Sequence, residues 1–539
     1  MPRPILAPAL LAGLLALTPF SGRSQQHDHT HGGVPPAPAT LGRVHFPVQC
    51  SPEAQVAFDE GIKLQHSFWY QAAGAAFQQA RQRDPGCTMT HWGEALSLLT
   101  NPYSPPAASN LRQGRALLDE AKRLGARNER EAAYIEALSL VFAGDDVAQH
   151  RARLGAYRDA MGRLHARFPD DTEAAIQYAL ILGVAAPLTD RTYADQLRGA
   201  AILEAEWQRQ PEHPGIVHYL IHLYDYPPLA ARGVRAAERY ATLAADASHA
   251  LHMPSHIFTR IGRWDGSIET NRRSADRAAT TGDVDGEFHA LDYMVYAYLQ
   301  TGQDDAARRA FGSAGRARST VPPRNAHAFA AAAMPARLAL ERGAWAEAAA
   351  LPAPARESAF PYTDALTYFA RAIGLARSGR PAEAAADIAA LRRIADALRS
   401  RDAYWAEQVD IQRETAEGLV LFASGRREEG LVALRAAADH QDRTDKHVVT
   451  PGPLAPAREI LAEALFEAGQ AAAALREFEA VQQTEPRRFR AVAGAGRAAE
   501  QAGDREAARR HYAALLEIAP NADAARSELA QARTFVGTR

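Results

Sequence analysis

The amino-acid sequence predicts an all-α fold in which helix-turn-helix repeats stack into a solenoid. Alanine, leucine, arginine and glutamate dominate, and no stretch alternates with the two-residue period of a half-buried strand. Near the C-terminus, turn-forming residues recur at one spacing, because Gly469 and Gly503 lie 34 residues apart, as do Pro486 and Pro520. A period of this length is typical of stacked helix hairpins, which bury their apolar faces against their neighbours.

Small and aromatic residues occupy fixed places within this period. The residues that carry the pattern are Phe478, Gly496, Ala499, Ala508 and Tyr512. On these residues the segment 455–535 resembles the tetratricopeptide-repeat family. Residues 61–85, GIKLQHSFWYQAAGAAFQQARQRDP, show the same pattern. The resemblance implies a right-handed superhelical solenoid whose concave groove, lined by repeat positions 2, 5 and 9, binds a peptide or protein partner.

A second resemblance concerns residues 66–95, HSFWYQAAGAAFQQARQRDPGCTMTHWGEA. This block is similar to one near the start of a group of exported bacterial tetratricopeptide proteins of unassigned activity. It therefore implies a fold but no reaction.

The start of the chain predicts export. Arg3 precedes an apolar run from Ile5 to Leu17 and then small residues, which indicates a signal peptide over 1–24 and a periplasmic or secreted product. Residues 25–45, rich in His, Gly and Pro, are predicted to be a disordered leader. We expect an N-terminal solenoid over 46–313 and a C-terminal solenoid over 326–535. No later apolar run is long enough to span a membrane.

The two cysteines, Cys50 and Cys87, are predicted to form a disulfide. They flank the first predicted helix hairpin, and antiparallel helices bring those two ends together. In an oxidising compartment this bridge would stabilise the fold by roughly 4 kcal/mol on the chain-entropy account. The alternative, a reactive thiol pair, lacks the short CxxC spacing.

Histidines recur on successive predicted helices. His218 and His222 are four residues apart, and His252 and His256 repeat this pair 34 residues later, so each pair shares one helix face. Counting from the repeat turns places both pairs at groove positions 5 and 9. In the next unit the groove positions 2, 5 and 9 are His289, Asp292 and Tyr296.

These side chains predict a shared metal site. The predicted ligands are His218, His222, His252, His256, His289 and Asp292, with His249 as a further possibility. Neutral imidazoles suit Zn, Cu, Fe or Ni, and Asp292 or Tyr296 would then be weak candidates for a catalytic base. The alternative is that the histidines only form hydrogen bonds inside the fold.

An internal comparison favours a functional role. The segment from His252 to Trp264, HMPSHIFTRIGRW, aligns without gaps to AMPARLALERGAW, from Ala333 to Trp345. The second copy has Ala333 and Arg337 in place of His252 and His256. The helix therefore does not need histidine at these positions in order to form.

Three other features of the sequence indicate less about function. Glu459 and Glu463 fall at positions 5 and 9 of a later repeat and are predicted to line the groove, although an acidic pair of this spacing also suits a solvated face. The sequence contains no GxSxG, GK[ST], HExxH or paired CxxC motif. A net charge of −2 gives no support for nucleic-acid binding.

Two hypotheses follow for function. The first is a periplasmic or secreted tetratricopeptide scaffold that binds a peptide or protein partner in its groove and carries a histidine-lined metal site. The second is a metal-dependent enzyme, a hydrolase or oxidoreductase, or a metal carrier that uses the same histidines. The sequence specifies neither the partner nor the reaction.

Overall fold

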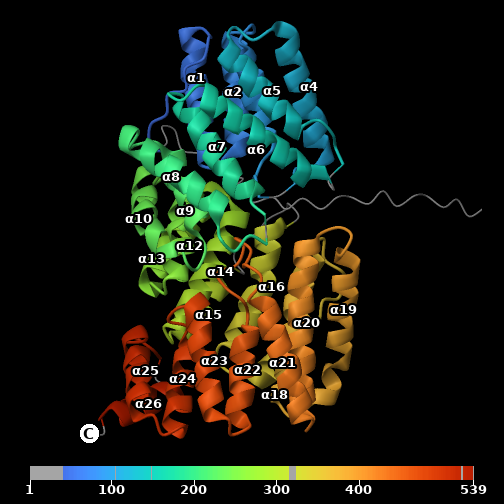
Figure 1. Cartoon of the computed structure of the whole chain (residues 1–539), viewed down its shortest axis with the longest axis vertical. Helices are drawn as coiled ribbons and strands as arrows, with labels where there is room; N and C mark the ends of the chain where they lie inside the picture. The colour runs from blue at the N-terminus through green and yellow to red at the C-terminus, as the bar shows by residue number, and fades with distance from the viewer. Residues whose placement is uncertain are drawn as a thin grey trace, which may run out of the picture.

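The computed structural model describes residues 40–103, 105–146, 149–187, 189–314, 323–523 and 526–537. Within these ranges the regular secondary structure is helical, without strands, and most neighbouring helices are antiparallel (Figure 1). The prediction of an all-α fold of stacked tetratricopeptide-type hairpins is confirmed. The predicted signal peptide over 1–24 lies outside the described residues, as do positions 25–39 of the predicted leader.

The upper body in Figure 1 contains helices α1 to α14. Their bounds are α1 Pro52–His66, α2 Tyr70–Arg83, α3 Thr88–Leu98, α4 Ala108–Leu124, α5 Glu129–Val141, α6 His150–Arg167, α7 Thr172–Ala185, α8 Ala194–Arg209, α9 Pro214–Tyr224, α10 Val234–Leu243, α11 Ser248–His252, α12 Pro254–Arg260, α13 Trp264–Thr281 and α14 Val284–Gln300. A short 3-10 helix, Ala230–Gly233, precedes α10.

The remaining helices form the lower body. Their bounds are α15 Asp304–Ala314, α16 Asn325–Leu340, α17 Trp345–Ala349, α18 Pro361–Arg377, α19 Ala385–Leu398, α20 Ala403–Ala423, α21 Arg427–Gln441, α22 Ala457–Glu467, α23 Ala471–Thr484, α24 Phe489–Gln501, α25 Arg505–Ile518 and α26 Ser527–Gly537. A second 3-10 helix, Pro381–Ala384, precedes α19.

The repeat pattern has a direct steric basis. A Cβ on Gly496 would lie 2.7 Å from the ring of Tyr512, and one on Gly61 would lie 2.5 Å from the ring of Phe77. In both hairpins, the glycine of the first helix thus admits the aromatic ring of the second. Gly469, at the end of α22, has φ +78°, a left-handed conformation that L side chains rarely adopt.

The hydrophobic cores do not divide where the sequence suggested a domain boundary. One buried cluster extends from Leu41 to Phe258. Another joins Ala314 of α15 to Ala330 and Met334 of α16, across the gap between the predicted solenoids. The two bodies are therefore continuous through α14, α15 and α16.

The C-terminal helices return to the middle of the molecule. The indole Nε1 of Trp264 donates to the carbonyl of Arg487 at 3.0 Å, and Arg526 forms a buried ion pair with Asp304 at 2.6 Å. Figure 1 accordingly shows α24 to α26 below α13 to α15. The last repeats thus pack against the central ones.

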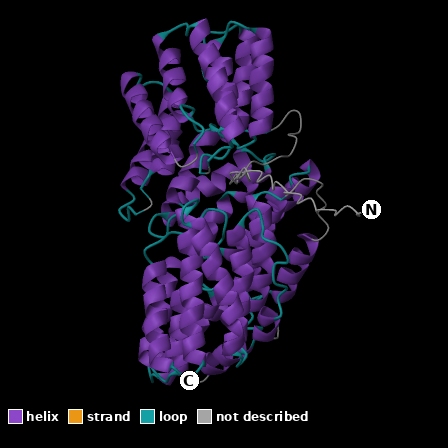
Figure 2. Ribbon diagram, turned by 90° about the vertical axis from the view of Figure 1, so that its right-hand side faces the viewer, coloured by secondary structure: helices purple, strands orange, loops and turns teal. Residues whose placement is uncertain are grey.

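One long connection also enters the middle. We call residues 442–456, between α21 and α22, the central segment; Figure 2 shows loops gathered at this level. The Tyr293 hydroxyl donates to the carbonyls of Val448 and Thr450 at 3.0 and 3.1 Å. Arg337 donates to the carbonyl of Gly452 at 3.1 Å. The chain thereby packs its own backbone against α14 and α16.

The start of the described chain corrects one boundary. Residues 40–45 fall in the predicted disordered leader, but Leu41 is buried and the amide of Thr40 donates to Asp246 at 2.8 Å. Residues 40–43 therefore contact the loop after α10 and the loop before α9, ahead of the start of α1. The predicted disulfide is present, with the Cα atoms of Cys50 and Cys87 5.2 Å apart.

Among the described helices, none is both long and apolar enough to cross a membrane.

Candidate metal centre

The predicted histidines come from four helices that meet inside the upper body. His218 and His222 lie on α9, His249 and His252 on α11, and the remaining two are on α12 and α14. A proline at position 254 lacks the N–H of a helix interior and separates α11 from α12. His249, left open by the sequence, is helical and belongs to the group.

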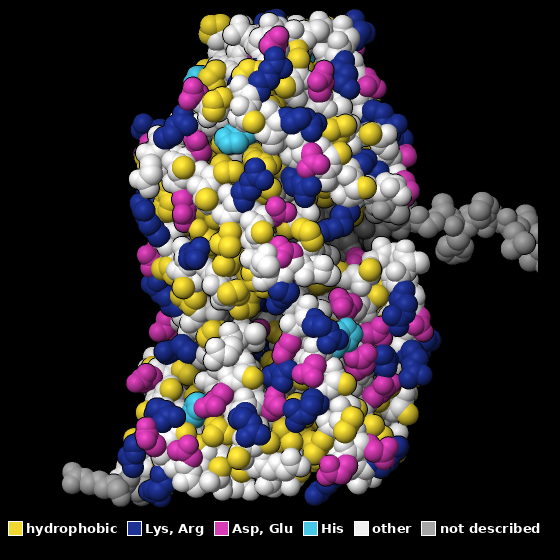
Figure 3. Space-filling model, in the orientation of Figure 1, with side chains coloured by type: hydrophobic (Ala, Val, Ile, Leu, Met, Phe, Trp, Pro, Cys, Tyr) yellow, Lys and Arg dark blue, Asp and Glu magenta, His cyan; other side chains and the backbone are white. Residues whose placement is uncertain are grey.

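These histidines are buried, and do not line an open groove. The repeat count placed them on the open groove, but the side chain of His218 is fully buried and that of His222, the most exposed of the six, is only 7% exposed. The reason is that the groove is filled by the chain itself, by Phe68 on one side and the central segment on the other. On the face shown in Figure 3, histidines form only isolated patches.

Three of these histidines form a first triad. The ligand nitrogens of His218, His222 and His249 all lie within 4.8 Å of one another. The Nε2 of His218 lies 3.0 Å from the Nε2 of His249 and 3.2 Å from that of His222. The Nδ1 of His218 faces the carbonyl of His66 at 2.6 Å. Because a carbonyl only accepts, Nδ1 carries the proton and Nε2 carries a lone pair.

The other three form a second triad, His252, His256 and His289, with the same 4.8 Å limit. The Nε2 atoms of His252 and His256 are 3.1 Å apart. The Nδ1 of His252 faces Oδ1 of Asn271 at 2.6 Å, and the Nδ1 of His256 faces Asp225 at 2.9 Å. The Nδ2 of Asn271 donates to the carbonyl of Ser267, which fixes the amide orientation.

Two lone pairs consequently face each other in the second triad. Both Nδ1 atoms donate to oxygen acceptors, so in neutral rings both Nε2 atoms of His252 and His256 are acceptors at 3.1 Å. Burial lowers the pKa of His256, although Asp225 acts in the opposite direction. Burial also lowers the pKa of His218 well below its usual value. Unprotonated nitrogens held this close together can act as ligands for a cation.

The spacing of these nitrogens matches a metal ion. Ligand nitrogens about 2.0 Å from a tetrahedral ion lie about 3.3 Å apart. The two triads also adjoin, since the ring centroids of His222 and His256 are 6.1 Å apart and those of His249 and His252 are 6.4 Å apart. Two ions held in this way would be neighbours.

Asp225 connects the second triad to a buried charge network. Its carboxylate accepts from Arg260 at 2.8 Å and lies 3.5 Å from the amine of Lys446 in the central segment. Burial alone would raise the pKa of Asp225, but Lys446 and Arg260 hold it well below its usual range. Burial lowers the pKa of Lys446 to about 8. The ionised carboxylate orients His256 in the manner of outer-shell partners in metal sites.

Asp292 and Tyr296, predicted near the histidines, have other partners. Both oxygens of Asp292 face Arg337, with 2.8 Å between Nε and Oδ1, and Asp292 belongs to neither triad. The Tyr296 hydroxyl accepts from Arg488 at 3.2 Å. Position 292 is one turn beyond His289 on α14, where it faces α16. The structure thus gives neither residue a place beside the histidines as ligand or base.

Glu459 and Glu463 do not form a solvated acidic face. Glu459 is buried and accepts from Arg488 at 2.7 Å, while Glu463 pairs with Arg377 at 2.8 Å and also with Arg490. They line a small pocket among these arginines. Their contacts join α22 to α18 and α24.

The sequence reasoning missed a third cluster. His66 and His213 both contact Glu173, at 3.1 and 2.8 Å, and the other nitrogen of His66 faces Tyr219 at 2.8 Å. Burial would raise the pKa of Glu173, but the two histidines hold it below its usual range. Both ring nitrogens of His66 and both oxygens of Glu173 are hydrogen-bonded in this cluster, which holds the His66 carbonyl against the Nδ1 of His218. These residues lie far apart in the sequence, and no spacing indicated them.

Phe68 was also missed. Its ring lies 4.4 Å from that of His218 and 5.0 Å from that of His249, between ring centroids. It has φ +58°, a conformation that a bulky residue rarely adopts. Such local strain persists only where the surrounding structure imposes it, and it clusters at functional sites.

The chain was compared with known proteins. No protein-family model and no curated protein matches it. Among solved structures, the APC/C hetero-tetramer Cut9-Hcn1 contains a similar chain, with TM-score 0.33 and 12% identity over 89% of this chain and 90% of that one. Yeast Tom70 has TM-score 0.26 and 10% identity over 90% and 94%. Likeness at these scores carries no argument about function.

The repeat architecture follows from the chain's own hairpins. The molecule is a tetratricopeptide-type α-solenoid that encloses two adjacent histidine triads.

Proposed function

We propose that this protein is an exported repeat scaffold that holds a pair of transition-metal ions on its two histidine triads. The observation that carries the proposal is the pair of Nε2 lone pairs of His252 and His256, which face each other at 3.1 Å in a site where burial disfavours protonation. A cation between them removes that repulsion. The disulfide supports export, because such bonds persist in oxidising compartments.

The ligand type narrows the choice of ion. Imidazole nitrogens suit Zn, Cu, Fe or Ni, whereas Mg and Ca prefer oxygen. Three protein ligands leave an open position, which is the arrangement of catalytic rather than structural zinc sites. The proposal therefore includes metal-dependent hydrolysis or oxidation as well as metal carriage, and in each case the solenoid supplies the rigid support.

Metal content tests the proposal directly. We expect two ions per chain in protein that lacks residues 25–33, whose histidines offer further ligands, after purification without a histidine tag and reconstitution with Zn, Cu, Fe or Ni. His256→Asn should lose one ion, and His222→Asn combined with His256→Asn should lose both. His440→Asn, a histidine outside the triads that pairs with Glu414, is the matched control and should retain both.

Further variants separate binding from folding. The double change His252→Ala and His256→Arg copies Ala333 and Arg337, and it should keep wild-type helicity while losing the second ion. Wild-type protein that takes up none of Zn, Cu, Fe and Ni would refute the proposal. Unfolding of both the asparagine variants and this double variant would instead make the histidines structural.

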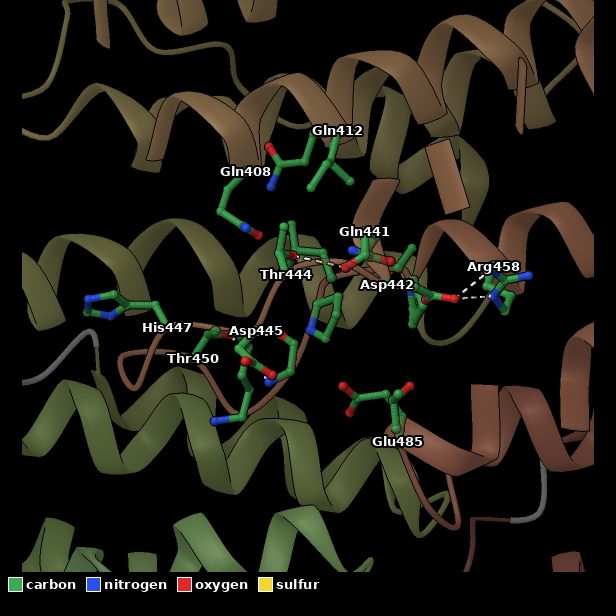
Figure 4. Close-up of a pocket in the computed structure, with 18 of the residues that line it drawn as sticks. Gln408, Gln412, Gln441, Asp442, Thr444, Asp445, His447, Thr450, Arg458 and Glu485 are labelled. Carbon is green, nitrogen blue, oxygen red and sulfur yellow. Dashed lines mark hydrogen bonds and ion pairs between the residues drawn. The ribbon is translucent and has the colours of Figure 1, made fainter. Parts of the chain in front are cut away.

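Partner binding is a second candidate function, favoured by a polar pocket between the bodies. Gln408 and Gln412 lie one turn apart on α20 and line this pocket, opposite Glu485 and the central segment (Figure 4). Within the described chain, the Nε2 of Gln408 and the Oε1 of Gln412 are buried without hydrogen-bond partners. A donor and an acceptor in this arrangement suit the backbone of an extended peptide.

A peptide library tests this second function. Gln408→Leu with Gln412→Leu should abolish capture of a selected peptide, whereas chelators should leave it unchanged. Retention of binding in the double variant would remove the pocket from consideration.

A further inference from the structure

An apolar pocket adjoins Phe68. Its volume is about 690 Å³ when the open space at its mouth is included. Leu96, Leu154, Leu180 and Ile181 supply most of its aliphatic wall. We call this space the Phe68 pocket.

Two buried polar atoms lie in this apolar lining. The Oε1 of Gln65 and the Nδ1 of His150 have no hydrogen-bond partner within the described chain. The two residues are 9% and 6% exposed. A buried polar group without a partner costs about 1–3 kcal/mol, so two of them in one pocket call for a ligand that can satisfy both.

The chemistry of the two atoms specifies that ligand. The amide oxygen of Gln65 only accepts, so the ligand must donate to it. Burial lowers the pKa of His150 to about 4, so its ring is neutral at neutral pH and offers a donor or an acceptor according to tautomer. A hydroxyl group can donate and accept at once. A charged group would lose its hydration without gaining an opposite charge among the lining residues.

Phe68 connects the pocket to the histidines. The residue lines the pocket, and its ring also contacts His218, His222 and His249 at centroid distances of 4.4 to 5.8 Å. A single side chain thus borders the apolar space and also contacts the first triad. Its backbone is in the left-handed region, with φ +58°.

We propose that the Phe68 pocket binds a small uncharged molecule with an apolar body and one hydroxyl group, held beside the histidine triads. That the bound molecule serves the ions rests on the proposed function. The pocket itself does not, because its lining and polar atoms are independent of any metal.

Calorimetric titration of the full chain with three probes tests the pocket. 4-Methylphenol should bind, toluene should bind about tenfold more weakly because the polar atoms stay unpaired, and 4-methylbenzoate should bind more weakly still. Gln65→Leu should bring 4-methylphenol to the affinity of toluene. Gln196→Leu, which removes a buried amide on α8 that lines neither pocket, is the matched control and should leave the affinity for 4-methylphenol unchanged.

Variants that fill the pocket with a larger side chain test the proposal in a second way. Ile181→Trp should abolish binding, and Leu154→Phe serves as a milder filling change if the first variant fails to fold. Equal affinity for the three probes, or binding that survives both filling variants, would overturn the pocket.

A second readout addresses the link to the histidines. In Co(II)-loaded protein, 4-methylphenol should shift the visible ligand-field absorption, and Ile181→Trp should remove the shift. Binding without any shift would overturn the link between pocket and ions. A chain that binds 4-methylphenol but takes up no Co(II) or other metal would support the pocket and sink the metal function, so the two failures are distinguishable.

Discussion

Arg337 and Asp292 form a fully buried ion pair, with 2.8 Å between Nε of the guanidinium and Oδ1 of the carboxylate. Arg337 stands where the earlier repeat has His256, and His256 also faces an aspartate, Asp225. The two repeats thus use one helix position differently. In the later repeat the guanidinium also donates to Thr450 and Gly452 and anchors the central segment.

Breaking this pair should strongly destabilise the protein. Asp292→Asn leaves the guanidinium of Arg337 buried without a carboxylate, which typically costs about 3–5 kcal/mol. Urea unfolding measures the change. The matched control is Asp276→Asn in the exposed pair with Arg272, which should stay within about 0.5 kcal/mol of wild type. An Asp292→Asn variant as stable as this control would show that the pair contributes little.

The oxygen acceptors behind the second triad should determine metal affinity. Asn271→Leu removes the acceptor of His252 without leaving a charge unpaired, and Asp225→Asn weakens the acceptor of His256. Each change should lower affinity by about 10- to 100-fold, as measured by competition with a chelator. Asp276→Asn is again the control. Unchanged metal affinity in both variants would mean that the imidazole rings bind metal equally well without the acceptors at their Nδ1 atoms.

His150 should make the metal-free protein sensitive to acid. Its pKa is about 4 in the folded protein because of burial, against a usual value of 6.5. The unfolded chain therefore binds a proton first, so stability falls as the pH drops from about 6.5 through 4. His150 should thus lower the free energy of unfolding at pH 4.5 by about 2–3 kcal/mol relative to pH 7.

Urea unfolding at pH 7 and pH 4.5 measures this loss. His150→Leu should show a smaller difference between the two pH values than wild type, and His440→Asn, which alters a more exposed histidine, should not. The same pH dependence in wild type and His150→Leu would contradict a buried neutral histidine.

The fold was predictable because its signals are local. Gly469 and Gly503 mark left-handed turns, and the glycines at 61 and 496 make room for aromatic rings. Cys50 and Cys87 flank one hairpin, so their bridge also follows from nearby sequence. The leader boundary was wrong, since Leu41 is buried and the neighbouring Thr40 is held by Asp246, far along the chain.

The candidate site was predictable only in part. Spacing within helices identified His218, His222, His252 and His256, because residues four apart share a helix face. It did not identify Asn271, Asp225 or Phe68, which approach the histidines from other elements. It also assigned Asp292 to the site, although α16 supplies an arginine that holds this carboxylate elsewhere.

The sequence alone determined the helical repeats, the disulfide pair and which helix faces carry histidine, since all three depend on contacts within one or two hairpins. Tertiary structure decided that the histidines are buried, that they divide into two triads and that their second nitrogens face oxygen acceptors. These properties arise where α1, α9, α11, α12 and α14 meet under the central segment. No periodic pattern encodes them, because contacts such as His218–His66 and Tyr293–Thr450 join residues 152 and 157 positions apart.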